Sequence, residues 1–530
     1  MNKLPIGIQS FEKIRSEGYV YVDKTEQIHD MISSGSSYIL SRPRRFGKSL
    51  LVSTIAAYFE GRKELFHDLA IEKYEQQKPD EEQWISYPVI LFSLSGGDYS
   101  SPDGLEDMLN LEMERCRKRW LKDDEPLSGS TLSGKFASLI EALYHETGRK
   151  IVVLVDEYDK PLLETAIINE EQEEKNRTLF KSFFSVLKDK DFYLQFVFFT
   201  GVTKFSRVSV FSDLNQLKDI SLSDRYAAIC GLTEAEMKNS FITEIKELAD
   251  ANGYSENECY EKLRSMYDGY RFSGRGEKLY NPFSLLNAFY DKRLGSYWFD
   301  TGTPTFLIHK LESTEYQPED FTNGVSVTEQ ELSNYRIDDP NPVPLFYQAG
   351  YLTIRSWSPE FQSYTMCFPN EEVKYSFLQS LLNSRFDGKG QVSSFSASGF
   401  VTDLRSGRTD DFMIRLRSLF SSIPYAEGPV SYQEREWRNQ MYLVFTLLGQ
   451  YVRTEIHSAQ GRCDCIAETK DYVYVFEFKQ DGQCDDAMKQ IKEHGYAEPY
   501  RADGRKIILI GAVFSEKEKT LSAWKAETLK

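Results

Sequence analysis

Long apolar runs are missing from this sequence. It has no stretch of about eighteen consecutive apolar residues, the length that a membrane-spanning helix needs. Its first residues, MNKLP, lack the apolar core of a secretory signal. Cysteine is also scarce: seven residues, an odd number, are scattered along the chain, which fits unpaired thiols in a reducing compartment. We therefore expect a soluble, cytoplasmic protein without a membrane partner.

Excess positive charge is missing as well. The formal net charge is −17, which argues against a protein coated with nucleic acid. The charge is uneven: residues 431–530 contain 15 lysines and arginines against 16 acidic residues, so almost all of the negative charge lies before them. With 530 residues, of which 41% are hydrophobic, the chain is long enough for two to four domains with their own cores.

A phosphate-binding pattern is present near the start. Residues 42–49, RPRRFGKS, lie between an apolar strand at 36–41 and an apolar-periodic helix that runs to about residue 59. In such a loop, backbone N–H groups and the helix N-terminus attract phosphate, Lys48 adds a charge and the Ser49 hydroxyl can bind magnesium. Arg42 replaces the usual first glycine, so this loop alone could also be a basic surface loop. We expect Lys48 to be exposed in the empty site, and the residues that contact a nucleotide to be Arg45, Phe46, Gly47, Lys48, Ser49 and Leu50.

A second pattern supports the first. Residues 151–155, IVVLV, predict a strand buried on both faces, and Asp156 and Glu157 follow at its carboxyl end, where open α/β sheets bind ligands. Asp156 would hold magnesium through water, and Glu157 would orient or deprotonate the attacking water. A solvated turn explains one acid but not the combination with Gly-Lys-Ser. Together the two patterns predict a nucleoside triphosphate site.

Further apolar runs complete an α/β domain. They predict three more strands, at 87–93, 193–200 and 227–231. Because strands alternate with helices, we expect a P-loop fold with a doubly wound parallel sheet over residues 1–232. Thr200 and Thr203 lie at the carboxyl end of the fourth strand, where they could sense the terminal phosphate or the water. Arg207 and Arg225 follow and are candidates for an arginine finger, although most such residues are ordinary surface arginines.

Three stretches together are specific to one family. RPRRFGKS at 42–49, VDEYDKP at 155–161 and FTGVTKFS at 199–206 closely resemble the AAA-ATPase-like family of bacterial proteins, whose members commonly carry a C-terminal PD-(D/E)XK nuclease-like domain. The resemblance extends over almost the whole chain and makes Arg42 the family's own version of the loop. It implies ATP as the nucleotide, ATP hydrolysis as the activity and Mg²⁺ as the metal.

The middle of the chain is less informative. Its aromatic-rich stretches predict packing first, and we expect a lid of small helices over the nucleotide. Tyr21 or Asp23 could lie near the base, although Asp23 and Thr25 would also cap a helix. We expect four parts: the ATPase-like domain at 1–232, the lid or middle region at 233–385, a connector at 386–425 and the nuclease-like domain at 426–530.

The last hundred residues contain a second site pattern. Residues 472–479, YVYVFEFK, predict a strand whose period of two places Glu477 and Lys479 on one face, and Asp464 belongs to the strand before it. An Asp followed by Glu-x-Lys on the adjacent strand is the PD-(D/E)XK arrangement. The two carboxylates would bind magnesium, and Lys479 would lower the pKa of the attacking water or position it. By itself, Glu-x-Lys also occurs as a surface charge pair. With the preceding ATPase-like motifs, it predicts a restriction-endonuclease-like α/β domain that acts on nucleic acid.

Neighbouring residues leave alternatives open. Glu434 opens a helix where related nucleases place a further metal-binding acid, but Ser431 and Glu434 also form a capping box that needs no metal. Gln490 resembles the glutamine that follows Glu-x-Lys in many of these nucleases. Cys463 and Cys465 would suit zinc only with a second pair at ligand spacing, which the sequence lacks.

Two hypotheses of different class follow. The first is an ATP-dependent or ATP-regulated nuclease that uses Asp464, Glu477 and Lys479 on nucleic acid. The second is a nucleotide switch whose C-terminal domain binds nucleic acid or a protein without cleavage. The triad favours the first, while the acidic surface and the lack of a basic stripe favour the second. Whether the chain is a monomer or a homo-oligomer stays open.

Overall fold

The computed structural model divides the chain into two units. Unit 1 comprises residues 1–303 and 323–373, and unit 2 comprises residues 304–322 and 374–530. The structure describes residues 3–122, 127–166, 169–203, 214, 216–299, 305–333, 339–384, 396–422, 430–456, 465–502 and 504–529. Within these ranges, no helix combines the length and the hydrophobicity that a bilayer span requires.

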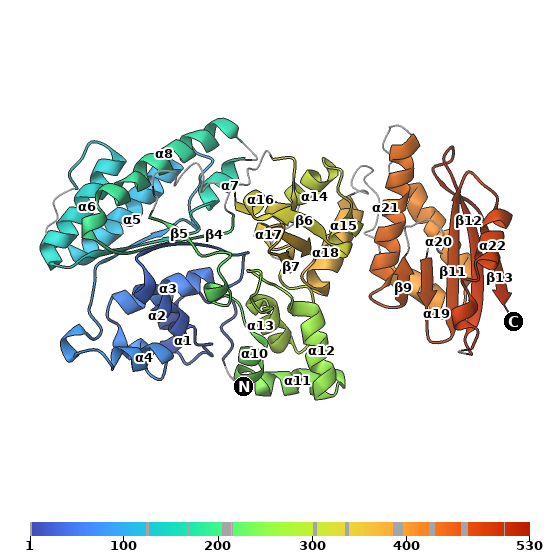
Figure 1. Cartoon of the computed structure of the whole chain (residues 1–530), viewed down its shortest axis with the longest axis horizontal. Coiled ribbons are helices and arrows are strands. Elements are labelled where there is room, and N and C mark those ends of the chain that lie inside the picture. Colours follow the sequence, from blue (N-terminus) through green and yellow to red (C-terminus); the bar gives the residue numbers. More distant parts are fainter. Residues whose placement is uncertain are drawn as a thin grey trace. The chain divides into compact units, whose positions relative to one another are not determined.

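Unit 1 is built on a parallel five-stranded sheet in the order β2-β3-β4-β1-β5 (Figure 1). Its strands are β1 (Ser37–Ser41), β2 (Val89–Ser93), β3 (Ile151–Asp156), β4 (Leu194–Gly201) and β5 (Lys218–Asp219). Every residue of β3 is buried, as expected for a strand covered on both faces. The predicted doubly wound α/β fold is confirmed, and four of its strands lie where the sequence places them.

The predicted strand at 227–231 is wrong, because this segment is irregular and the fifth strand is the short β5. Ala227, Ile229 and Cys230 are buried, but they pack beside the phosphate loop and not in the sheet. The N–H group of Gly231 donates a hydrogen bond to the carbonyl of Phe46 at 3.2 Å. Burial against a loop and burial in a sheet produce the same short apolar run, so periodicity could not distinguish them.

Helices cover both faces of this sheet (Figure 1). One side carries α1 (Phe11–Ser16), α2 (Thr25–Ser34), α3 (Lys48–Phe59) and α4 (Ala70–Glu75), and the other carries α5 (Gly104–Trp120), α6 (Leu132–Thr147), α7 (Lys160–Ala166) and α8 (Glu170–Asp189). The rings of Phe59 and Phe196 pack on the first side at 5.2 Å, and those of Phe184 and Phe199 on the second at 5.0 Å. Strand β4 therefore contributes to both cores.

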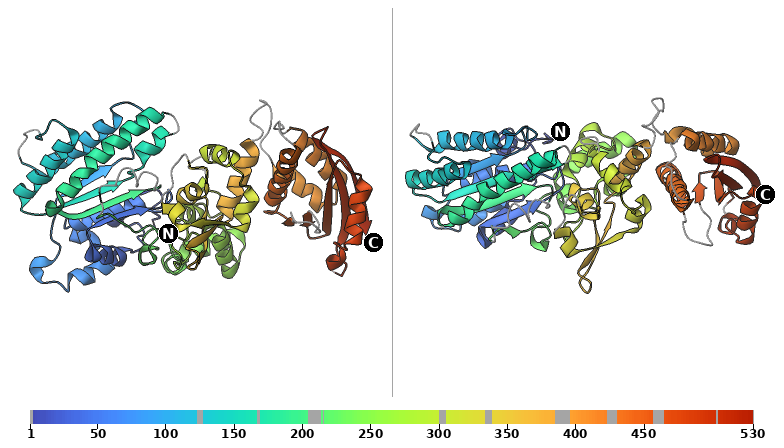
Figure 2. Two further views of the ribbon diagram at one scale, coloured as in Figure 1. Left: turned by 45° about the horizontal axis from the view of Figure 1, so that its top comes forward. Right: turned by 90° about the horizontal axis from the view of Figure 1, so that it is seen from above.

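The rest of unit 1 is mainly helical, as predicted for the middle region. Its helices are α10 (Glu234–Ser240), α11 (Ile242–Asn252), α12 (Glu256–Tyr267), α13 (Pro282–Asp291), α16 (Glu329–Ser333) and α17 (Val343–Ala349). An antiparallel sheet in the order β6-β8-β7 is an addition to the predicted fold, with β6 (Val325–Thr328), β7 (Thr353–Ser358) and β8 (Ser363–Cys367). The hairpin of β7 and β8 projects from the body of the unit (Figure 2).

Unit 2 is built on a second five-stranded sheet, in the order β13-β12-β11-β10-β9. Its strands are β9 (Arg453–Ile456), β10 (Cys465–Glu468), β11 (Tyr472–Gln480), β12 (Lys506–Ser515) and β13 (Thr520–Leu529). Strands β11 and β12 run parallel, and all other neighbours run antiparallel. This mixed sheet confirms the α/β architecture predicted for the nuclease-like domain.

Helices cover both faces of this sheet too (Figure 1). On one face lies α22 (Cys484–Glu493), and on the other lie α19 (Ala397–Arg405), α20 (Thr409–Ser422) and α21 (Val430–Leu448). Unit 2 also includes α14 (Thr305–Glu312) and most of α15 (Pro318–Asn323) and α18 (Glu371–Ser384). In β11, Val473 and Val475 pack in one core with Met488 of α22. The ring of Phe476 faces the opposite side and packs on Phe412 and Phe445. The alternation predicted for this strand is therefore present.

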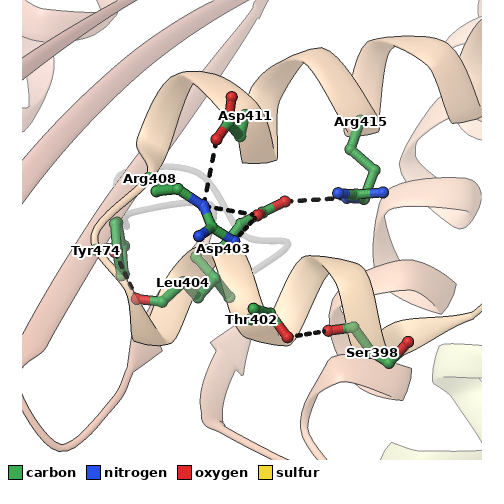
Figure 3. A network of polar contacts seen from close by, with 8 residues as sticks. All are labelled: Ser398, Thr402, Asp403, Leu404, Arg408, Asp411, Arg415 and Tyr474. Carbon is green, nitrogen blue, oxygen red and sulfur yellow. Dashed lines mark hydrogen bonds and ion pairs between the residues drawn. The ribbon is translucent and has the colours of Figure 1, made fainter.

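Helices α19 and α20 lie in the segment predicted as a connector, and they are part of the folded unit. The buried carboxylate of Asp403 lies between Arg408 and Arg415 (Figure 3). Its Oδ1 accepts from Arg408 Nη2 at 2.8 Å, and its Oδ2 accepts from Arg415 Nε at 3.0 Å. The Tyr474 hydroxyl of β11 donates to a carbonyl of α19 at 2.7 Å. These contacts join the two helices to each other and to the sheet.

Asp403→Asn should loosen the attachment of α19 and α20. An amide cannot neutralise the two guanidinium groups, but Arg408 and Arg415 are 48% and 46% exposed, so solvent screens part of the loss. We expect a cost of about 1–2 kcal/mol, which corresponds to roughly tenfold faster local opening. Hydrogen–deuterium exchange should show this at β11 and not at β3. The control Asp486→Asn, at an exposed position of α22, should change neither, and unchanged protection of β11 in Asp403→Asn would contradict the assignment.

Candidate functional site

The loop at 42–49 joins β1 to α3 at the carboxyl edge of the sheet. Gly47 and Arg45 have left-handed backbone, with φ of 91° and 68°, and Gly47 caps α3. Lys48 and Ser49 are the first residues of the helix. The N–H groups of a first helical turn have no intrahelical partner, so the loop offers them to an anion. The predicted strand, loop and helix are thus confirmed around Gly-Lys-Ser.

We expected Lys48 to be exposed, but it is buried. Its side chain is 6% exposed, and Nζ donates to the carbonyls of Arg42 and Pro43 at 2.9 Å each. Burial lowers the pKa of the Lys48 ammonium, and the negative charges of Asp156 and Asp159 oppose this. A phosphate oxygen is a stronger acceptor than a neutral carbonyl, so a bound phosphate would compete for this charge.

Arg42 points into the protein, away from the cavity side of the loop. Its buried guanidinium donates from Nη1 to the carbonyls of Ser41 at 2.9 Å and Ser221 at 2.8 Å, and from Nη2 to that of Tyr226 at 3.1 Å. It also lies 4.2 Å from the ring centroid of Phe272. Arg42 therefore ties the start of the loop to the segment after β5 and to the middle region. A bulky residue fits this loop because its side chain is buried in the protein and is not among the described residues that line the cavity beside the loop.

A cavity of about 570 Å³ adjoins the loop. The phosphate loop lines it from 44 to 51, and Glu157 and Asp159 line it from the turn after β3. Apolar side chains of the N-terminal segment and the middle region also line it, among them Ile8, Val20, Val22, Leu232, Phe241 and Phe283, and so do polar groups such as Lys24, Lys160 and Glu164. Charged groups beside apolar ones suit a ligand with a phosphate group and a ring. The helices expected to form a lid thus contribute to the cavity.

The two predicted acids after β3 have different surroundings. Asp156 is buried, and its Oδ1 accepts a hydrogen bond from the Thr200 hydroxyl at 2.6 Å. Glu157 has left-handed backbone, with φ of 58°, and lines the cavity. Burial first, and then the charge of Asp156, raise the pKa of the Glu157 carboxyl, while Lys48 and Lys160 lower it. A carboxylate with a raised pKa accepts a proton more readily near neutral pH.

Thr200 and Thr203 are fully buried and hold acids. The Thr203 hydroxyl donates to Asp159 Oδ2 at 2.8 Å, as the Thr200 hydroxyl does to Asp156. Neither threonine is among the described residues that line the cavity. Asp159 is a functional candidate that the sequence analysis did not single out. The sequence signal was a third acid two residues after Glu157, but its burial and its hydrogen bonds with Val202 and Thr203 appear only in the structure.

Of the other candidates in unit 1, one lines the cavity and two have structural contacts elsewhere. Tyr21 lines the cavity, whereas Asp23 Oδ1 accepts from the N–H and hydroxyl of Thr25 at 2.8 and 2.6 Å and so acts at the start of α2. Arg225 forms an ion pair with Asp30 and is not among the described residues that line the cavity. The other arginine-finger candidate, residue 207, lies outside the described residues.

In unit 2, the structure brings Glu477, Lys479 and Gln490 together. Glu477 is 2% exposed, and Lys479 Nζ donates to its Oε1 at 3.1 Å and also contacts the amide oxygen of Gln490. Gly511 of β12 pairs with Glu477, and a side chain there would lie 2.8 Å from the carbonyl of Cys484. Glycine thus lets α22, with Gln490, approach the sheet closely. The predicted Glu-x-Lys pair occupies one face of β11 beside this helix.

The remaining candidates of unit 2 are less fully described. Asp464 and Cys463 lie outside the described residues. Glu434 belongs to α21 (Val430–Leu448), and both its metal-binding role and the capping-box alternative stay predictions. Cys465 is buried in β10.

Family models match the two regions of the chain that contain the candidate sites. Residues 5–211 match a family model described as "Predicted AAA-ATPase", and residues 432–524 match one described as "PD-(D/E)XK nuclease superfamily". A relative from Azotobacter chroococcum mcd 1, described as "Uncharacterized protein in vnfD 5'region", is 35% identical over 548 residues, covering 99% of each chain. The chain belongs to the predicted AAA-ATPase family with a C-terminal PD-(D/E)XK domain. This confirms the family that the sequence motifs indicated.

Each family match covers one of the two candidate sites. The predicted AAA-ATPase match covers the phosphate loop and the acids after β3, so the buried Arg42 lies within the matched region. The PD-(D/E)XK match covers β9 to β12 with α22, and therefore Glu477, Lys479 and Gln490. The two families generally use a nucleotide and a divalent metal. Helices α19 and α20 lie outside both matches, although they pack on the nuclease-like sheet.

Arg42→Ala should destabilise unit 1, because it leaves buried carbonyls without their donors and removes the packing on Phe272. We expect a loss of more than about 2 kcal/mol, measured by urea unfolding. The matched substitution Arg44→Ala, at an exposed position of the same loop, should cost roughly 0.5 kcal/mol or less. Equal stability of the two variants would contradict the structural role of Arg42.

Proposed function

We propose that this protein binds and hydrolyses ATP and that its C-terminal domain cleaves nucleic acid with magnesium. The observation that carries the first part is one cavity, lined by Lys48 and Ser49 from the phosphate loop and by Glu157 from the turn after β3. A cation, a hydroxyl and a proton acceptor around a space of this size are what hydrolysis of a triphosphate requires.

The phosphate end of the nucleotide would bind at the start of α3. Backbone N–H groups and Lys48 supply the positive charge, and Arg44 and Arg45 line the same end. The hydroxyl of Ser49 and the carboxylate of Asp156 are the hard oxygen donors that suit Mg²⁺. Magnesium would neutralise charge on the two outer phosphates. The adenine would occupy the apolar part of the cavity beside Tyr21.

Glu157 would orient the attacking water and take its proton. Its position in the cavity and its raised pKa support this role, because the carboxylate is partly desolvated yet reaches the ligand space. Thr200 and Thr203 support the site from behind by bonding to Asp156 and Asp159. They would sense the terminal phosphate only through these acids.

The nuclease proposal depends on Glu477 and Lys479. A buried carboxylate fits a hard divalent cation, and Asp464 is the residue directly before β10, whose Cys465 pairs with Phe476 of β11. We infer that Asp464 and Glu477 bind magnesium together, with Glu434 as a further ligand. Lys479, oriented by Gln490, would place its charge beside the attacking water and the phosphate.

Lys48→Met and Glu157→Gln should separate ATP binding from turnover. Lys48→Met keeps an apolar stem in the buried site but removes the charge on the phosphates, so ATP affinity should fall by roughly a hundredfold or more. Glu157→Gln spares the phosphate loop, so it should keep ATP bound and slow hydrolysis by roughly 100-fold or more. Calorimetry and phosphate release measure the two effects. Unchanged affinity in a folded Lys48→Met protein, or wild-type turnover in Glu157→Gln, would contradict the respective role.

Glu477→Ala and Lys479→Ala should separate metal binding from cleavage. Removing Glu477 takes away a carboxylate ligand, so magnesium affinity of the nucleotide-free protein should collapse along with cleavage. Removing Lys479 should leave magnesium affinity nearly intact and slow cleavage by roughly 100-fold. ATP hydrolysis should be unaffected in both. Equal magnesium affinity of wild type and Glu477→Ala would reject the nuclease, and nucleic-acid binding without cleavage by the wild type would favour a nucleotide switch.

A further inference from the structure

The turn after β3 and the end of β4 are locked together by one buried carboxylate. Asp159 is 1% exposed, and its Oδ2 accepts from the N–H groups of Val202 at 3.0 Å and Thr203 at 2.6 Å. The Thr203 hydroxyl donates to the same oxygen at 2.8 Å, and Val202 N–H also lies 3.1 Å from Oδ1. These donors belong to a segment more than forty residues further along the chain.

Two further contacts hold the same pair of segments. The Tyr158 hydroxyl donates to the carbonyl of Thr203 at 2.8 Å, and the Tyr158 N–H donates to the carbonyl of Thr200 at 3.0 Å. Gly201 lies between them without a side chain. A Cβ there would lie 2.6 Å from Asp159 Oδ1 and 2.6 Å from the Tyr158 ring, so only glycine permits this approach.

Glu157 needs such support because its backbone is strained. A left-handed residue other than glycine costs about 1–2 kcal/mol and persists only where its surroundings fix it. Glu157 lies between Asp156, which ends β3, and Asp159, which is bonded to the end of β4. The main chain on both sides of Glu157 is therefore held, and the turn closes with Lys160 N–H donating to the carbonyl of Glu157 at 3.0 Å.

We propose that Asp159 is a positioning residue for ATP hydrolysis: by bonding to Val202 and Thr203, it holds Glu157 in the left-handed conformation that directs its carboxylate to the cavity. The inference rests on the proposed hydrolysis of ATP. Asp159 acts through Glu157, and it explains why Thr203, which was predicted to sense phosphate, bonds to an acid. Its donors among the described residues are neutral N–H and hydroxyl groups, whose hydrogen bonds offset the cost of burying the carboxylate.

Asp159→Asn tests the role in the full-length protein. The amide nitrogen cannot accept from an N–H group, so part of the lock is lost at nearly constant volume. We expect kcat to fall by roughly ten- to a hundredfold while ATP affinity stays within about threefold, because the phosphate loop is untouched. Thr203→Val should lower kcat by several fold and Thr203→Ser should restore it. The control Thr147→Val, which removes a similar hydroxyl at the end of α6, should change nothing.

A double-mutant cycle with Glu157→Gln decides whether Asp159 acts through Glu157. If it does, the double variant hydrolyses ATP no more slowly than Glu157→Gln alone, measured in single turnovers with excess enzyme. Multiplicative losses would overturn the proposal, as would a kcat of Asp159→Asn equal to that of the wild type. A loss of ATP affinity above about tenfold with kcat unchanged would make Asp159 a nucleotide contact and also overturn it.

The outcomes also separate this inference from the proposed function. If the wild type does not hydrolyse ATP, or if Glu157→Gln turns over normally, the proposed function fails before Asp159 is considered. If both behave as expected and the cycle is multiplicative, only the role of Asp159 fails. Should Asp159→Asn not fold, the same cycle with Thr203→Val and Thr203→Ser gives the decision, since valine is nearly isosteric with threonine.

Discussion

Two cations buried within one loop are the constraint on which the phosphate-loop edge of unit 1 depends. Arg42 and Lys48 are both nearly inaccessible, and both donate hydrogen bonds to main-chain carbonyls. Burying a charge is costly unless hydrogen bonds replace its water, so these carbonyls must face inward. The carbonyls of Tyr226 and Ala227 therefore face Arg42. These hydrogen bonds hold the irregular segment after β5 against the start of the loop.

Three acids at the end of β3 and in the turn after it differ in their contacts. Asp156, Glu157 and Asp159 lie within four residues, yet only Glu157 has its backbone in the left-handed region. Asp156 and Asp159 each accept from a threonine at the end of β4. Because parallel neighbouring strands end at the same edge, these threonines meet the acids across one strand spacing. Glu157 and Asp159 both line the cavity, and Asp159 is held there by the N–H groups of Val202 and Thr203.

In unit 2, the two faces of strand β11 carry different groups: core side chains on one and the candidate site residues on the other. Alternate residues of β11 face opposite sides, so Phe476 packs in the core with α20 and α21 while Glu477 and Lys479 lie on the side of α22. Helix α22 can approach because Gly511 has no side chain. The helices α19 and α20, which were expected to be a connector, cover the other face. The buried charge of Asp403 fixes them there.

The sequence alone determined the elements whose signals are local. Apolar runs predicted four strands of the first sheet, Gly-Lys-Ser predicted the phosphate loop, and Glu-x-Lys predicted the second candidate site. These signals are local, because the spacing of apolar residues and the backbone conformation of a glycine depend on only a few neighbouring residues. Contacts between distant segments needed the tertiary structure. The inward direction of Arg42 and the packing of the irregular segment 227–231 depend on contacts with carbonyls up to 185 residues away. The bond from Thr203 to Asp159 spans 44 residues, and no local pattern records such a pairing.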